Sequence, residues 1–327
     1  MPLLIINAAD VRKLLPMKDC VRVMDQAMRA VSDHRVDMPE RLVTALEDNS
    51  GYFFLMPGLP RDAPVFGAKL VSLLPGNPAV GRPNVQGFIT LFDRASGTPV
   101  ALVDGFEITR LRTAAASALA TRELARKDAS SHGIFGAGVL AAAHLEAIAC
   151  VRDIREVRIW ARDPEKARSF AAAQAENYDF SITAVEDPAQ AARCDIVSTV
   201  TNSATPVLQG KWLAPGSHVN LVGAHRADHR EIDSKGMVHA ALFVDARESA
   251  LREAGDLLIP VSEGKVGADH IQAEIGDVLN GCANGRSNSR QVTVYKSLGL
   301  VAQDLFAAGQ VLSAARISGL GQLVDFP

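Results

Sequence analysis

The first hundred residues alternate short apolar segments with turns, a pattern typical of strands. An amphipathic helix is expected over 18–33, where apolar residues recur every three or four positions, and Asp10 is expected to cap a shorter helix before it. The turn over 94–97 predicts a hairpin. The expected strands cover 3–6, 41–45, 51–56, 66–73, 86–93 and 98–103. This stretch therefore predicts a mixed or antiparallel sheet with a helix.

The pattern changes after an Ala-rich helix expected over 113–126, because buried strands then alternate with helices. Such alternation predicts a parallel sheet wound with helices on both faces, an α/β fold of the Rossmann type. The expected strands cover 133–135, 156–160, 195–201 and 218–223, with helices after the first and second. The last helix, expected over 297–316, is predicted to return to the first domain.

Two domains are therefore expected. Residues 1–115 with 305–327 form an α+β substrate-binding and dimerisation domain, and residues 116–304 form a dinucleotide-binding domain. We expect the substrate to bind between them, facing the carboxyl ends of the parallel strands.

The sharpest local signal is a glycine turn between a strand and a helix. Gly136 permits a tight turn, Gly138 lets a pyrophosphate approach the backbone, and Ala141 allows close packing of helix on strand. The pattern is weak alone, but the alternating strands and helices around it support a nucleotide-binding site. A doubly wound domain that binds nothing is the alternative.

Composition argues against several classes of function. The 327 residues carry a net charge of −3 without a basic run, so no nucleic-acid partner is expected. No segment reaches the length of a membrane span, and the four dispersed cysteines contain no C-x-x-C pair. A cytoplasmic protein with reduced thiols is therefore predicted.

Several motifs, in this order, resemble the ornithine cyclodeaminase/mu-crystallin family over nearly the whole chain. They are Gly67-Ala-Lys69-Leu-Val71, Val85-Gln86-Gly87, Thr109-Arg-Leu-Arg112-Thr113, the glycine turn, 195–201, Val244-Asp245, Glu253-Ala-Gly255-Asp256 and Thr293-Val-Tyr-Lys296-Ser297-Leu-Gly299. The resemblance implies a homodimer that handles a small amino or imino acid with a nicotinamide dinucleotide. Members include cyclodeaminases, alanine dehydrogenases and imino-acid reductases.

An imino-acid substrate carries a carboxylate, which calls for cations. Arg112 offers a planar fork for bidentate binding, and Lys69 adds a positive charge within an apolar strand. Both are predicted as catalytic and substrate-binding residues. Arg41 is a third substrate-binding candidate, with a surface cation as the equal alternative.

Two departures from the family pattern bear on the reaction. Cyclodeaminases carry Glu where this chain has Phe54, and Asp where it has His225. Losing both carboxylates argues against cyclodeamination and favours a cyclic imine that lacks a distal ammonium. Phe54 is predicted to contact this substrate. His225 is either the catalytic proton donor or a polar loop residue. His229 lies four positions on, but without a clear third ligand no metal is expected.

The end of the second expected Rossmann strand bears on cofactor choice. Ala161 stands where NAD-using members place Asp, and Arg162 suits a 2′-phosphate, so NADP(H) is preferred with NAD(H) possible. Asp163 either restores an acid to the ribose or caps the helix that follows. The predicted cofactor-binding residues are Gln86, Thr113, Gly136, Ala137, Gly138, Val139, Arg162, Thr199, Thr201, Val222 and Ser297.

These features together predict an NAD(P)H-dependent reductase of Δ1-pyrroline-2-carboxylate or Δ1-piperideine-2-carboxylate that forms L-proline or L-pipecolate. Ornithine cyclodeaminase and an alanine-dehydrogenase-like enzyme are the alternatives within the family. A mu-crystallin-like protein that binds NADPH or a small ligand is the alternative from another class.

Overall fold

A computed structural model describes residues 2–48 and 50–325. The chain divides into two compact units, one of residues 1–112 and 300–327 and the other of residues 113–299. The helix α3, Gly105–Leu124, contains the first boundary.

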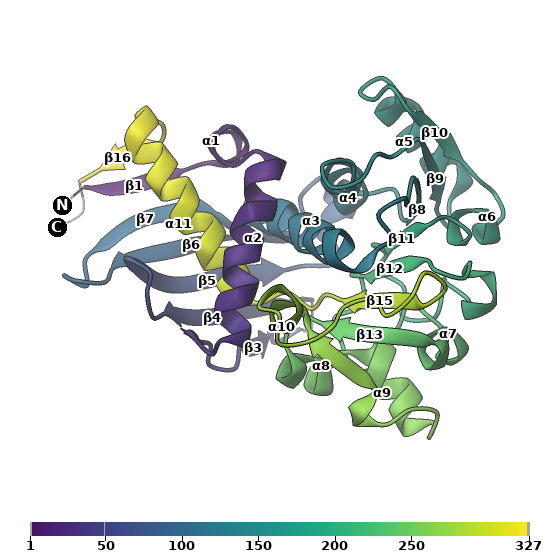
Figure 1. Ribbon diagram of the computed structural model, residues 1–327. Helices are drawn as coiled ribbons and strands as arrows, with labels where there is room; N and C mark the ends of the chain where they lie inside the picture. The colour runs from purple at the N-terminus through teal and green to yellow at the C-terminus, as the bar shows by residue number, and fades with distance from the viewer. Residues whose placement is uncertain (1, 49, 326–327) are drawn as a thin grey trace. The chain divides into compact units, whose positions relative to one another are not determined.

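The first unit contains a mixed sheet with strand order β16-β1-β7-β6-β5-β4-β2, and β3 pairs with β4 (Figure 1). Strands β1 and β7 are parallel, whereas β4 to β7 form antiparallel neighbours. The strands are β1 Leu3–Ile6, β2 Val36–Asp37, β3 Leu42–Ala45, β4 Tyr52–Pro60, β5 Val65–Leu73, β6 Val85–Asp93, β7 Pro99–Asp104 and β16 Gln322–Val324. The sheet is thus mixed, as the alternating pattern predicts.

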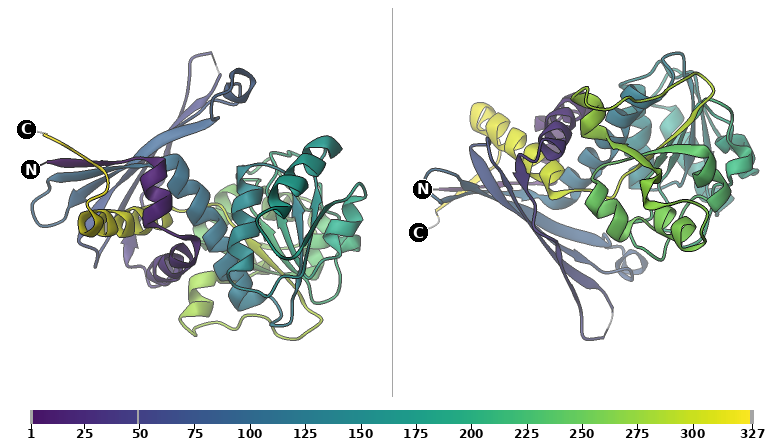
Figure 2. Two further views of the ribbon diagram at one scale, coloured as in Figure 1. Left: turned by 90° about the horizontal axis from the view of Figure 1, so that it is seen from above. Right: turned by 60° about the horizontal axis from the view of Figure 1, so that its bottom comes forward.

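Two helices, α2 (Met17–Ser32) and α11 (Val301–Ser318), lie on one face of this sheet (Figure 2). Gly58 of β4 faces α11, because a Cβ there would lie 2.7 Å from Leu305. The opposite face carries the exposed apolar side chains Leu42, Phe53, Leu59 and Phe88. One face is therefore covered by helices and the other is apolar and exposed within this unit.

The second unit contains a parallel sheet with strand order β10-β9-β8-β11-β12-β15-β13-β14. Its strands are β8 Ser131–Phe135, β9 Glu156–Trp160, β10 Ser181–Ala184, β11 Ile196–Thr199, β12 His218–Leu221, β13 Ala240–Val244, β14 Ile271–Glu274 and β15 Val292–Lys296. The helices between them are α4 Val139–Ala149, α5 Pro164–Ala175, α6 Pro188–Ala192, α7 Ser234–His239, α8 Arg247–Glu253, α9 Gly255–Ser262 and α10 Ile275–Leu279. This is the predicted Rossmann-type α/β fold.

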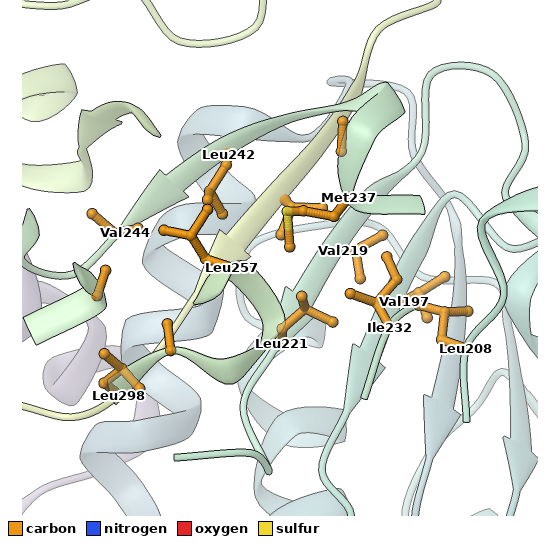
Figure 3. Packing of buried hydrophobic residues seen from close by; sticks show 14 of the residues in the cluster. Val197, Leu208, Val219, Leu221, Ile232, Met237, Leu242, Val244, Leu257 and Leu298 are labelled. Atoms are coloured by element: carbon orange, nitrogen blue, oxygen red, sulfur yellow. The ribbon is translucent and has the colours of Figure 1, made fainter. Parts of the chain in front are cut away.

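The core of the second unit fills the space between its sheet and the later helices (Figure 3). Val197, Val219 and Leu221 come from the central strands, while Met237 of α7 and Leu257 of α9 pack against them. Burying such side chains contributes about 1.5–3 kcal/mol each relative to exposure. This packing holds the strands whose carboxyl ends carry the candidate site.

Some predicted boundaries are wrong for identifiable reasons. Asn7, rather than Asp10, caps the first helix α1 (Ala8–Leu14), and its side chain accepts from the backbone of Ala9 and Asp10. Helix α3 begins at Gly105, eight positions before the predicted start, because Asp104 accepts from the Glu107 backbone N–H and Arg112 pairs with the buried Asp304. The last helix begins at Val301, after a turn in which Gly299 has φ +84°.

Candidate active site

The glycine turn follows β8 and leads directly into α4. Gly136 has φ +127°, and a Cβ there would lie 2.9 Å from the Val200 carbonyl oxygen, so only glycine fits without strain. At Gly138 a Cβ would meet nothing within 4 Å, so the space above its backbone is open. Gly138 is the N-cap of α4 and makes no side-chain hydrogen bond. The turn thus fits a pyrophosphate bound at a helix N-terminus.

The strand order reverses direction between β8 and β11, since the chain first builds outward through β9 and β10 and then returns to β11 and β12. Ligands of open α/β sheets bind at such a reversal, beyond the carboxyl ends of the strands. Ala137 and Val139 lie at this point, and Val139 is 56% exposed although apolar. The geometry therefore supports a dinucleotide site here.

The residues that follow β9 bear on the two roles considered for Asp163, a contact to the ribose and a helix cap. Its side chain accepts from the backbone N–H groups of Glu165 and Lys166, at 3.1 and 3.4 Å, and so caps α5. Arg162 is exposed, and its guanidinium has no hydrogen-bond or ion-pair partner among residues 2–48 and 50–325. Ala161 and the exposed cation Arg162 thus follow this strand, and Asp163 serves as the helix cap.

In the first unit, Lys69 and Arg112 converge on one carboxylate, that of Asp304. The Lys69 ammonium and the Arg112 Nε each lie 3.0 Å from Asp304 Oδ1. All three side chains are at least nine-tenths buried. Two cations around one buried anion leave a net positive charge, which suits a carboxylate ligand.

The cluster also retains hydrogen-bond donors. Lys69 Nζ donates to Thr109 Oγ1 at 2.6 Å and to Asp304, which leaves one of its three N–H groups. Arg112 Nη1 donates to Gln303 Oε1 at 2.8 Å, and within the described chain Nη2 has no hydrogen-bond partner. Burial lowers the pKa of Lys69 to about 8, partly opposed by Asp304. Lys69 is therefore a cation at neutral pH that titrates just above it.

Two further substrate-binding candidates lie near Lys69. Phe54 shares its face of the sheet, because Met56 pairs with Lys69 and Phe54 is two positions along β4. Arg41 contributes an electrostatic effect that lowers the Lys69 pKa, so its charge is close to the cluster. Gln86 lies on the opposite face of the sheet, since its neighbour Ser72 is three positions from Lys69. The structure therefore does not bring Gln86 into this cluster.

Several family motifs meet at the carboxyl edge of the parallel sheet. Lys296 forms an ion pair with Asp256, with 2.9 Å between Nζ and Oδ2, and donates a hydrogen bond to the Ala224 carbonyl. The Asp245 carboxylate accepts from the backbone N–H groups of Leu298 and Gly299 at 2.7 and 2.8 Å. Side chains far apart in sequence thus fix the loops that follow β12 and β15.

The packing around Gly255 shows why the motif Glu253-Ala-Gly255-Asp256 contains a glycine. A Cβ at this position would lie 2.1 Å from the His229 carbonyl oxygen and 2.6 Å from that of Arg226. The loop after β12 therefore packs directly on the start of α9, and only glycine leaves room for it. His225 lies exposed in this loop and its Nδ1 is 3.2 Å from the Gly223 carbonyl oxygen.

The other predicted cofactor residues lie within the second unit. Val222 and Ser297 are buried, and their backbone N–H groups donate to Thr199 and Leu221. Thr113 is buried in α3. The structure contains no group of three or more potential metal-ligating side chains within residues 2–48 and 50–325, and no helix there has the length and apolarity to cross a bilayer.

Two buried acids that bind candidate site residues were not predicted from the sequence. Asp304 is the only acid in α11, and a lone acid in a mostly apolar helix is the signal that would have found it. Glu231 is also fully buried, but it follows a charged loop and reads as a surface residue in the sequence. Burial and the neighbouring Asp256 raise the pKa of Glu231.

Known proteins share the fold of this chain. A Δ1-pyrroline-2-carboxylate reductase of Bacillus cereus is 34% identical over 326 residues, covering 99% of this chain and 100% of the relative. The structure of the Thermococcus litoralis Δ1-pyrroline-2-carboxylate reductase in complex with NADH and L-proline matches with a TM-score of 0.95 and 35% identity, over 98% of this chain and 100% of that one.

An archaeal alanine dehydrogenase dimer with bound NAD matches with a TM-score of 0.94 and 31% identity, over the full length of both chains. The family model for ornithine cyclodeaminase/mu-crystallin proteins matches residues 3–318. This chain belongs to the ornithine cyclodeaminase/mu-crystallin family.

Proposed function

We propose that this protein is an NAD(P)H-dependent reductase that converts a cyclic α-imino acid to the corresponding L-amino acid. Δ1-Pyrroline-2-carboxylate and Δ1-piperideine-2-carboxylate are the candidate substrates, with L-proline and L-pipecolate as products. The observation that carries this proposal is the buried cluster of Lys69 and Arg112 around Asp304, which keeps cationic donors for a carboxylate. The full-length similarity to Δ1-pyrroline-2-carboxylate reductases supports the same activity.

Lys69 and Arg112 are assigned to the substrate carboxylate. Arg112 supplies the remaining edge of its guanidinium fork, and Lys69 supplies the third N–H of its ammonium. Because Asp304 holds both cations, little side-chain freedom is lost when the substrate binds. Arg41 is assigned as an additional cation for the same carboxylate, given its electrostatic effect on Lys69.

Phe54 favours a cyclic imine over ornithine. It shares a sheet face with Lys69 and offers an apolar ring where a distal ammonium would need a carboxylate. Reduction adds a hydride to the imine carbon and a proton to its nitrogen, and the bound nicotinamide supplies the hydride. We assign the proton to His225 in its imidazolium form, in which Nδ1 donates to the Gly223 carbonyl and Nε2 carries the proton that is transferred.

NADP(H) is the proposed preferred cofactor, with NAD(H) also accepted. Arg162 is exposed at the end of β9, whereas Asp163 is committed to capping α5. A guanidinium at this position pairs with a 2′-phosphate, whereas the Asp163 carboxylate is directed at the backbone N–H groups of α5 through Oδ1. The pyrophosphate is assigned to the turn of Gly136 and Gly138.

We also propose that the protein is a homodimer and works in the cytoplasm. The exposed face of the first unit's sheet carries Leu42, Phe53, Leu59 and Phe88, a set that a second copy would bury. The similar archaeal alanine dehydrogenase is a dimer. Light scattering would show a dimer for the wild type and a monomer for Phe53→Glu. A monomeric wild type would overturn this assignment.

Nicotinamide fluorescence tests whether the protein is an enzyme or only a binder. The protein is mixed with NADPH, and with NADH in parallel, before Δ1-pyrroline-2-carboxylate is added. A reductase changes the fluorescence on binding and then consumes the reduced dinucleotide when the imine arrives. A protein that only binds gives the first change without the second, and that result would overturn the proposal.

A further inference from the structure

Glu231 collects hydrogen bonds from two neighbouring strand ends. Its Oε1 accepts from the Thr201 backbone N–H at 2.8 Å and from Thr201 Oγ1 at 2.7 Å. Its Oε2 accepts from Thr199 Oγ1 at 2.8 Å and from the backbone N–H groups of Gly223 and Ala224 at 2.6 and 3.3 Å. One fully buried carboxylate therefore ties the residues that follow β11 to those that follow β12.

The carboxylate is itself held in place. The Glu231 backbone N–H donates to Asp256 Oδ1 at 2.7 Å, and Asp256 is paired with Lys296. Lys296 in turn donates to the Ala224 carbonyl, so the contacts close into a ring. Such a connected buried network is rigid, because each member loses a partner if any one moves.

The strand order shows which part of a dinucleotide lies over this ring. The pyrophosphate turn follows β8, and the strand end that contacts the adenosine ribose is that of β9, on one side of β8. The nicotinamide half must then extend to the other side, over β11 and β12. Those are the two strand ends that Glu231 joins.

We propose that Glu231 is a positioning residue for the nicotinamide half of the cofactor. It acts by holding the backbone at Thr201 and Gly223 in the conformation that receives the nicotinamide and its ribose. Thr199 belongs to the same network, because its buried hydroxyl donates to Glu231 and is not available to donate to a ligand. The proposal rests on the nicotinamide dependence proposed above and adds a role that no motif indicated.

Glu231→Gln is the sharpest substitution because it keeps the size of the side chain. The amide has only one acceptor oxygen, so its NH2 group must face the donors of Thr201 or those of Thr199, Gly223 and Ala224. Donors opposed to donors push one strand end away. The hydrogen bonds of the Glu231 carboxylate do not include the pyrophosphate turn of Gly136 and Gly138.

The experiment compares two ligands by titration calorimetry on the full chain. One is NADH or NADPH, whichever the wild type binds more tightly. The other is ADP-ribose, or its 2′-phosphate for NADPH, which lacks the nicotinamide. We expect Glu231→Gln to weaken the reduced dinucleotide by about tenfold while the truncated ligand changes by less than about twofold. Equal weakening of both ligands, or no weakening of either, would overturn the proposal.

Asp195→Asn is the matched control. Asp195 precedes the opposite end of β11 and accepts from the backbone of Ser130 and Ser131 and from Arg126. Its loss costs stability but leaves the ratio of the two affinities unchanged. If Glu231→Gln does not fold, Thr199→Val carries the test, with a selective loss of about threefold expected for the reduced dinucleotide. A Thr199→Val protein with an unchanged ratio contradicts the proposal.

Failure of this proposal is distinguishable from failure of the proposed reaction. A wild type that binds NAD(P)H but does not oxidise it with an imine refutes the reductase, while the ratio of affinities still tests Glu231. A wild type that binds neither dinucleotide refutes both.

Discussion

Lys69 and Asp304 form a buried ion pair, with 3.0 Å between Nζ and Oδ1, across 235 positions of the sequence. The pair joins the middle of β5 to the first turns of α11. Burial lowers the pKa of Lys69, and the Asp304 charge opposes that effect. The contact therefore keeps a cation in the cluster that we assign to the substrate carboxylate.

The pH dependence of imine binding follows from this pair. Because the pKa of Lys69 is about 8, the protonated form that binds a carboxylate declines above that pH, so kcat/KM for the imine should fall there. Asp304→Asn removes the charge that raises this pKa and should move the fall about one pH unit lower. Profiles of kcat/KM between about pH 6 and 10 would measure the shift. This interval spans about two units on either side of the Lys69 pKa.

Glu107→Gln is the control for that shift. Glu107 is a buried acid of the same unit, but its partners are Arg12 and Arg110 rather than the candidate site. The pH profile of Glu107→Gln should follow that of the wild type. Because the imine ionises in the same way in every assay, its own titration does not contribute to a difference between two profiles. A profile of Asp304→Asn that coincides with the wild type would refute the role given to the ion pair.

Arg112→Lys should weaken substrate binding more than cofactor binding. A lysine ammonium keeps the charge but cannot offer a planar fork to Gln303, Asp304 and a carboxylate at once. We expect the KM for the imine to rise by about tenfold with the KM for the reduced dinucleotide nearly unchanged. Steady-state kinetics with each substrate varied would show it, and the opposite split would remove Arg112 from the carboxylate site.

Ala161→Asp should shift cofactor preference toward NADH. The new carboxylate would accept a hydrogen bond from the 2′-hydroxyl of NADH and repel the 2′-phosphate of NADPH. The ratio of kcat/KM for NADH over NADPH should rise by about tenfold.

Asp163→Ser provides the comparison for Ala161→Asp, because serine also caps helices and Asp163 caps α5. Its cofactor preference should equal that of the wild type. If Asp163→Ser changed the preference and Ala161→Asp did not, the 2′-position would have been assigned to the wrong residue.

Three buried histidines of the second unit should make the protein sensitive to acid. Burial lowers the pKa of His132 and of His218 to about 3, and that of His144 to about 4, from 6.5. Above pH 6.5 both the folded and the unfolded chain hold these imidazoles neutral. Below it only the unfolded chain takes up their protons, so each should cost up to about 1.4 kcal/mol of stability per pH unit.

His132→Gln isolates one of these contributions. The amide can keep a hydrogen bond to Ser198 Oγ, which lies 3.0 Å from His132 Nε2, but it does not titrate. Urea unfolding between about pH 7.5 and 5 should show a shallower loss of stability by roughly one proton. The same slope in wild type and variant would mean that His132 is not kept neutral by the fold.

Local patterns were enough to predict the turn at Gly136 and the parallel sheet around it, because a strand, two glycines and a helix are contiguous. The position of Phe54 required the register of β4 on β5, which places it on the Lys69 face. The sequence indicates Phe54 as a departure from the family but not its neighbours.

The partners of the two acids that organise these clusters could not be predicted from the sequence. Asp304 meets Lys69 only because α11 returns to the first unit's sheet. Glu231 closes a charged stretch from His225 to Arg230 that reads as a surface loop, and only the approach of that loop to Gly255 shows that the acid is buried. Contacts between residues far apart in the sequence, rather than local propensity, decide the surroundings of both acids.

Reduction of the cyclic imine is best tested by the initial rate of NADPH and NADH oxidation with Δ1-pyrroline-2-carboxylate, measured beside NAD-dependent turnover of L-ornithine. A reductase with Phe54 and His225 in place of carboxylates should oxidise the reduced dinucleotide rapidly with the imine, form L-proline in equal amount, and leave ornithine unchanged. Turnover of ornithine to proline and ammonia, without reduction of the imine, would contradict the account.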